Sequence, residues 1–175
     1  GTKISDRVMG HDKTYEGTLR LGIETDSQDA DGQIVAEKDA TAITADQVRA
    51  QLDARRGDQL QTPPMVSAIK LNGVPLYKLA RKGETVERKP KLIHVYRFDL
   101  LDFASPDVRF VVECTKGTYV RTLAHDVGQS LGVGAHLVQL RRTKIGRIDV
   151  AHAHALDALL DAPSLDGKII PLAAA

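Results

Sequence analysis

The chain has little of what builds disulfide frameworks or membrane spans. It contains one cysteine, Cys114, so no disulfide can form within it, which fits a reducing compartment. Cys114 lies in an apolar stretch and is expected to be a buried thiol rather than a reactive one. No apolar run approaches the ~20 residues of a membrane helix. We therefore expect a cytoplasmic protein without a membrane span, whose 175 residues are enough for a core of its own.

Motifs of the common metal and cofactor enzymes are missing as well. No Walker motif and no His-Glu-x-x-His pair occurs. The Gly-Val-Gly segment at 132–134 lacks the third glycine of a dinucleotide fingerprint. The segment 26–32 fails as a calcium loop, because an EF-hand needs Asp first and Glu twelfth, where this chain has Ser27 and Lys38. The sequence therefore predicts no metal site and no cofactor.

Charge is unevenly distributed along the chain, although the net charge is only +1. Residues 63–91 carry seven Lys/Arg against two Glu, and residues 116–147 carry six Lys/Arg against one Asp. Residues 22–39 carry six acids against one Lys. Segregation of this kind can form a basic face that meets phosphates. The alternative is that the basic runs are solvated helix faces.

Hydrophobic periodicity predicts an α+β domain, with a mixed, mostly antiparallel sheet flanked by helices. Strands are expected over residues 14–21, 66–71, 91–102, 108–114 and 136–144. Helices are expected over residues 45–55, 76–82, from about 119 onward, and 153–160. Thr44 and Gln47 form a capping box at the start of the first helix. The strands at 91–102 and 108–114 are expected to pair as a hairpin.

The segment 114–123 runs from a strand into a helix through a Lys-Gly-Thr turn. Thr118 can cap the new helix, and Arg121 falls in its first turn. A cation at this end opposes the helix dipole, so its position is costly unless an anion lies beside it. Arg121 is therefore either a surface residue or a residue held against a carboxylate.

Several motifs in register resemble one known family. They are Lys13-Thr14-Tyr15, Leu21-Gly22, the segments 25–32, 61–70 and 76–83, Lys116-Gly117-Thr118-Tyr119-Val120-Arg121-Thr122, Gly134-Ala135-His136-Leu137 and Leu140-Arg141-Arg142-Thr143. Together they resemble the tRNA pseudouridine synthase B family. The likeness implies that residues 1–160 are part of the family's catalytic domain, with an RNA-clasping insertion at about 63–91. Residues 161–175 would be a tail leading toward the family's C-terminal RNA-binding domain, which this chain lacks.

The family isomerises uridine 55 in the T arm of tRNA to pseudouridine without a metal or cofactor. By resemblance, Tyr15 stacks on the target uracil, Asp29 contacts Arg121, and Leu140 packs near the target base. The family's nucleophile is an aspartate in a Gly-His-Thr-Gly-x-Leu-Asp-Pro segment, which would lie before Gly1 and does not occur in this chain. We therefore expect this chain alone to be inactive, with Arg121 lacking the carboxylate that it would orient.

The resemblance also implies RNA contacts and a monomeric protein whose partner is the tRNA T-arm stem-loop. The RNA-binding residues would be Lys70, Lys78, Arg81, Lys82, Arg88 and Lys89 in the insertion, together with Lys116, Arg141 and Arg142. Two other hypotheses stay open from the sequence. A non-catalytic RNA-binding module would keep the same fold and the same basic residues. An interaction domain with an incidental charge pattern would show no salt-dependent affinity for RNA.

Overall fold

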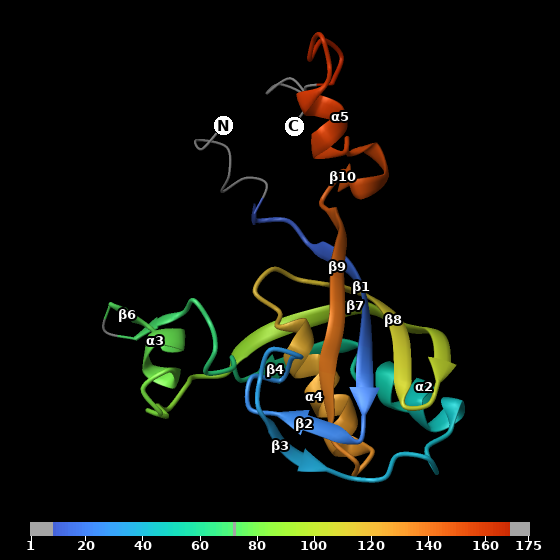
Figure 1. The fold of residues 1–175 in the computed structure, drawn as a ribbon. Coiled ribbons are helices and arrows are strands. Elements are labelled where there is room, and N and C mark those ends of the chain that lie inside the picture. Colours follow the sequence, from blue (N-terminus) through green and yellow to red (C-terminus); the bar gives the residue numbers. More distant parts are fainter. Residues whose placement is uncertain (1–8, 72, 169–175) are drawn as a thin grey trace.

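The fold is built on one six-stranded sheet. The computed structural model describes residues 9–71 and 73–168 (Figure 1). The strand order is β10-β9-β1-β8-β7-β4, and every neighbouring pair is antiparallel. The strands of this sheet are β1 (Lys13–Leu21), β4 (Gly57–Gln61), β7 (Lys91–Ala104), β8 (Asp107–Cys114), β9 (Ala135–Ile145) and β10 (Ile148–Asp149). This sheet and its helices confirm the expected α+β class.

The remaining elements are short. Two small antiparallel pairs join β2 (Ile23–Thr25) to β3 (Ile34–Glu37) and β5 (Lys70–Leu71) to β6 (Val74–Pro75). The helices are α2 (Ala45–Asp53), α3 (Leu76–Ala80), α4 (Val120–Ser130) and α5 (Leu156–Leu160), with a 3-10 turn at Val150–His152. Within the described ranges, no helix is long and apolar enough to cross a membrane.

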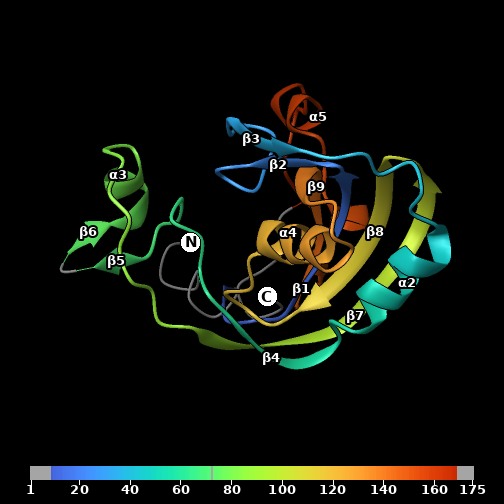
Figure 2. The ribbon, with the colours of Figure 1, turned by 90° about the horizontal axis from the view of Figure 1, so that it is seen from below.

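Helices α2 and α4 cover the same face of the curved sheet and share one core with it (Figure 2). Val48 and Leu52 of α2 are fully buried, as the capping-box helix predicts. Phe98 and Phe110 meet edge to face across β7 and β8, with ring centroids 5.3 Å apart. Each such buried side chain contributes roughly 1.5–3 kcal/mol relative to exposure. Cys114 belongs to this core, and burial raises the pKa of its thiol to about 11.

Residues 63–90 form an arm that projects from one side of the sheet (Figures 1 and 2). The arm carries β5, β6 and α3, and its two ends meet where Arg88 Nη1 donates to the Pro63 carbonyl at 3.0 Å. The arm covers the residues of the predicted insertion at 63–91, whose role in clasping RNA stays a prediction. The expected strand over 66–71 is wrong over residues 66–69, because only Lys70 and Leu71 pair.

Other local predictions also need correction. The expected helix at 153–160 begins only at Leu156, and the expected helix at 76–82 ends at Ala80. Strands β2, β3, β4, β6 and β10 were not predicted. Thr118 does not cap α4: the N-cap is Tyr119, and the Thr118 hydroxyl has no hydrogen-bond partner among the described residues.

Candidate active site

The four residues assigned to catalysis by resemblance line one cavity. Tyr15 comes from β1, Asp29 from the β2–β3 loop, Arg121 from the first turn of α4 and Leu140 from β9. The cavity has a volume of about 380 Å³. Residues that lie up to 125 positions apart in the chain (15 to 140) therefore meet at one place. The structure shows that the four residues line one cavity, and their catalytic roles stay predictions.

The β2–β3 loop holds the Asp29 carboxylate in a fixed position. Ser27 Oγ donates to Asp29 Oδ1 at 2.5 Å, and Thr25 Oγ1 donates to the Asp29 carbonyl at 2.7 Å. The turn is tight at Gly32, where a Cβ would lie 2.3 Å from Ser27 Oγ and 2.6 Å from Asp26 Oδ1. A larger residue at position 32 would displace Ser27 and Asp26. The polar turn therefore holds the Asp29 carboxylate in one direction.

Gln28 attaches this loop to the rest of the domain. Its backbone has a positive φ of 66°, which is uncommon outside glycine and asparagine. Its carbonyl accepts from the Leu137 amide at 3.0 Å, and its side-chain Oε1 accepts from Thr122 Oγ1 at 2.7 Å. The loop is therefore bonded both to β9 and to α4, the two elements that carry Leu140 and Arg121. No sequence pattern indicated this role of Gln28.

Arg121 makes the ion pair that its place in the helix requires. Its Nη1 lies 2.6 Å from Asp29 Oδ2, and its Nη2 donates to the Val66 carbonyl of the arm. The side chains are 19% and 24% exposed, so the pair is largely shielded from water. Burial alone would raise the pKa of Asp29, but the hydrogen bonds from Ser27 and Arg121 outweigh it and hold that pKa below its usual value. Asp29 is therefore a fixed anion at neutral pH.

The start of α4 is held by a side chain from a distant strand. Gln61 of β4 is only 4% exposed; its Oε1 accepts from the Tyr119 amide at 2.8 Å, and its Nε2 donates to the Tyr119 carbonyl at 3.1 Å. This bidentate contact gives a partner to the amide of Tyr119, the N-cap residue, which has no partner within the helix. Gln61 therefore ties the start of α4, just before Arg121, to β4.

Tyr15 lies on β1 between Val112 of β8 and Arg142 of β9. The ring is half-buried and packs against the hydrophobic core. Burial raises the pKa of the phenol, and the positive charge of Arg142 offsets only part of that rise. The ring therefore stays neutral and presents an aromatic surface to the cavity, which suits stacking on a base.

The residues assigned to RNA binding divide into two groups. Lys70, Lys78, Arg81, Lys82 and Lys89 are exposed on the arm, and Lys116, Arg141 and Arg142 are exposed near the sheet. Arg81 lies over the Tyr77 ring, 5.5 Å from its centroid. Arg88 is half-buried, and its Nη1 donates to the Pro63 carbonyl, so its side chain joins the two ends of the arm; its role in RNA binding stays a prediction.

Arg141 and Arg142 face opposite sides of the sheet. Tyr15 is opposite Arg142 and Glu16 is opposite Arg141, and directly opposed residues share a face. Arg142 therefore lies on the side of Tyr15, while Arg141 lines a different cavity together with Glu16 and Arg109. The two arginines therefore face different surfaces of the sheet, although they are adjacent in the sequence.

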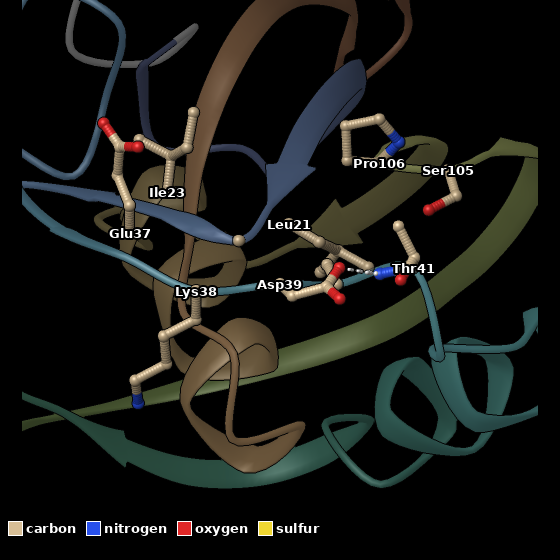
Figure 3. Close-up of a pocket in the computed structure, with 10 residues that line it drawn as sticks. Leu21, Ile23, Glu37, Lys38, Asp39, Thr41, Ser105 and Pro106 are labelled. Carbon is tan, nitrogen blue, oxygen red and sulfur yellow. Dashed lines mark hydrogen bonds between the residues drawn. The ribbon is translucent and has the colours of Figure 1, made fainter.

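A further cavity of about 470 Å³ lies where β1 ends, between the β7–β8 hairpin and residues 37–41 (Figure 3). Glu37, Lys38 and Asp39 line it, and Asp39 Oδ1 accepts from the Thr41 amide at 2.8 Å. None of the residues assigned to catalysis or RNA binding lines this cavity. Its acidic edge disfavours phosphate. Among the described residues, no cluster of three or more His, Cys, Asp or Glu could hold a metal ion.

Two family models cover the residues that surround the Tyr15 cavity. The TruB family pseudouridylate synthase N-terminal domain matches residues 1–120, and the tRNA pseudouridylate synthase B C-terminal domain matches residues 121–172. The chain belongs to the TruB family of pseudouridylate synthases. The family expected from the motifs is thereby confirmed. The boundary between the two matches falls inside α4, and β9 on one side of it pairs with β1 on the other.

Three relatives carry the name tRNA pseudouridine synthase B. The protein of Opitutus terrae is 51% identical over 98% of this chain and 72% of its own length. The protein of Francisella philomiragia is 45% identical over 98% of this chain and 57% of its own length. The protein of Burkholderia mallei is 48% identical over 98% of this chain and 56% of its own length. The chain thus spans little more than half the length of two of these relatives.

Solved structures support the fold. One, described as a Cbf5-Nop10-Gar1 complex, is 26% identical with a TM-score of 0.64, over 89% of this chain and 37% of that one. Another, described as an H/ACA RNP bound to a substrate RNA containing 2'-deoxyuridine, is 21% identical with a TM-score of 0.62. It covers 91% of this chain and 37% of that one, and it shows a shared fold alone.

Proposed function

We propose that this chain is part of a tRNA pseudouridine synthase that isomerises uridine 55 in the T arm, and that the Tyr15 cavity receives the target uracil. The observation that carries the proposal is the convergence of Tyr15, Leu140 and the Asp29–Arg121 ion pair on one cavity. The family membership and the name shared by the relatives give the reaction and the kind of substrate.

The proposed reaction breaks the N-glycosidic bond of the uridine, turns the uracil, and forms a carbon–carbon bond to the same sugar. The base must first leave its stack, which costs a few kcal/mol. Stacking on the half-buried Tyr15 ring offsets about 1–3 kcal/mol of that cost. Leu140, which is exposed at the mouth of the cavity, offers an apolar contact to the other side of the base or sugar.

Arg121 would orient the nucleophilic aspartate that the family carries upstream of the part aligned here. Its guanidinium has five N–H donors, and the structure uses one nitrogen for Asp29 and another for the Val66 carbonyl. Donors remain for a second carboxylate. A cation within ~4–6 Å lowers a carboxylate pKa by about 1–3 units, which keeps a nucleophilic aspartate ionised. Asp29 would fix the guanidinium and thereby the direction of those donors.

The basic side chains would dock the T-arm stem-loop through its phosphates, without reading its sequence. The arm presents Lys70, Lys78, Arg81, Lys82 and Lys89 on its surface. The Val66–Arg121 contact joins the arm to the catalytic cavity, so docking on the arm and placement of the uracil would be linked. We expect the protein to act as a monomer in the cytoplasm.

The test measures binding and chemistry separately on a T-arm stem-loop RNA. The 175-residue chain should bind the RNA with an affinity that falls as salt rises, and a longer form carrying the family's aspartate segment should convert uridine to pseudouridine. Salt-dependent binding without conversion in the longer form would favour a non-catalytic RNA-binding module. Absence of salt-dependent binding would contradict RNA recognition altogether.

A further inference from the structure

Another cavity, which we call the basic cavity, lies beside the Tyr15 cavity and is lined mainly by cations and apolar side chains. Its volume is about 680 Å³, and it lies where β1 begins, where β9 and β8 end, and where β7 begins. Its lining contains the cations Lys13, Lys91, Lys116 and Arg142 over an apolar floor that includes Leu92 and Ile145. No acidic residue is among the described residues that line it.

The four cations line one cavity, and no acidic side chain among its described lining residues neutralises their charge. Burial lowers the pKa of the Lys13 ammonium, and the charges of Arg142 and Lys116 lower it further, while Asp12 and Cys114 act in the opposite direction. Lys13 donates to the carbonyls of Met9 at 3.0 Å and His11 at 2.7 Å, which are neutral acceptors. Like charges held this close repel, so a bound anion would stabilise the cluster.

The basic cavity and the Tyr15 cavity are neighbours on the same elements. Lys13 and Tyr15 lie two positions apart on β1, so their side chains share a face and their Cα atoms are about 7 Å apart. The β8–α4 turn lines both cavities, with Lys116 and Gly117 on one and Thr118 to Arg121 on the other. Arg142, the cross-strand neighbour of Tyr15, stands between them.

We propose that this basic cavity binds a phosphodiester group of the RNA strand next to the nucleotide whose base enters the Tyr15 cavity. A phosphodiester supplies the negative charge that the cations lack, and the sugar beside it would contact Leu92 and Ile145. The proposal rests on the function proposed above. It adds Lys13 and Lys91 to the residues expected to contact RNA, and it gives Lys116 and Arg142 one shared phosphate.

The experiment compares two double variants of the chain in binding to a T-arm stem-loop. Lys91→Gln with Lys116→Gln removes two exposed cations of the basic cavity. Arg109→Gln with Lys144→Gln removes two exposed cations from the opposite face of the same sheet, with the same change in net charge. Lys13 is left intact because its hydrogen bonds hold the chain around Met9 and His11.

The readout is the slope of log Kd against log salt concentration. Loss of the one phosphate contact should make the slope shallower by up to about 0.7, the value expected per phosphate on a single strand. The control pair should leave the slope within error of the parent chain. Equal effects of the two double variants would overturn the basic cavity as a phosphate site, while leaving RNA binding itself intact.

A second arm locates the phosphate. Stem-loops are made with one neutral methylphosphonate linkage at each position around the target uridine. At a linkage next to that uridine, the neutral group should weaken binding to the parent chain. It should weaken binding to the Lys91/Lys116 variant much less, because that variant has already lost the cations that meet the phosphate. The same fold-loss in both proteins at every linkage would overturn the inference. If the parent chain binds no stem-loop at any salt concentration, the proposed function fails together with it.

Discussion

The Asp29–Arg121 ion pair makes a quantitative prediction for the substitution Asp29→Asn. The pair is neither exposed nor fully buried, with side chains 24% and 19% exposed. Exposed pairs contribute about 0–1 kcal/mol, and breaking a buried pair costs about 3–5 kcal/mol. We expect Asp29→Asn to lower the free energy of unfolding by about 2 kcal/mol, because Arg121 then lacks its anion at the positive end of α4. A urea midpoint lower by about 1 M follows from an m value of ~2 kcal/mol/M.

The pH dependence of that loss follows from the depressed pKa of Asp29. A carboxyl whose pKa is lower in the folded state adds stability above its unfolded pKa of about 3.9, and that stability disappears as pH falls through the folded pKa. The difference between parent and Asp29→Asn should therefore be full at pH 7 and shrink below about pH 4. Asp31→Asn is the matched control, because Asp31 is exposed on the same loop and forms no ion pair with any residue that the structure describes. Equal stability of the parent and Asp29→Asn at pH 7, or a difference that does not change with pH, would refute the reasoning.

Two further predictions test how the site is supported. Gln61→Ala should cost about 1–3 kcal/mol of unfolding free energy, because it leaves the amide of the half-buried Tyr119 without its partner, while the Tyr119 carbonyl still accepts from the Thr122 and Leu123 amides; Gln59→Ala, a less buried change on the same strand, is the comparison in urea melts. Cys114 should not react with a thiol reagent at pH 8 in the folded chain, because its pKa is about 11 and it is buried, and it should react fully in urea. Rapid reaction of Cys114 in the folded chain would show that β8 is open to solvent.

The sequence predicted the parts of the fold that have a local signal. Val48 and Leu52 mark one face of a helix that Thr44 and Gln47 cap, and the alternation at 108–114 matches β8. Strand β4 has no such signal, since it is polar and only Gln61 in it is buried. Strands β2 and β3 lie in the acidic stretch 22–39, where short half-exposed strands leave no hydrophobic pattern.

The site was less predictable than the sheet. From the residues alone, Arg121 in the first turn of a helix was either a surface residue or a residue held against a carboxylate. Asp29 as that anion came from the family resemblance, because 92 positions separate the two residues and no local rule joins them. Neither the local pattern nor the family resemblance predicted the contact of Gln61 with the Tyr119 backbone. The two residues are 58 positions apart, and the nearby Thr118 is the better local candidate for a cap. Contacts of this range depend on the tertiary fold.

The substitution Arg121→Lys tests most directly whether the Tyr15 cavity is the site of uridine isomerisation. It is made in the longer form that carries the family's aspartate segment, and the single-turnover rate of pseudouridine formation is measured beside the Kd for the T-arm stem-loop. Lysine keeps the charge but loses the planar fork that fixes a carboxylate. The rate should fall by about a hundredfold, the effect of misplacing a reacting group by ~1 Å, with little change in Kd. A rate within about twofold of the parent, as expected for a surface cation, would contradict the placement of Arg121 at the reacting centre.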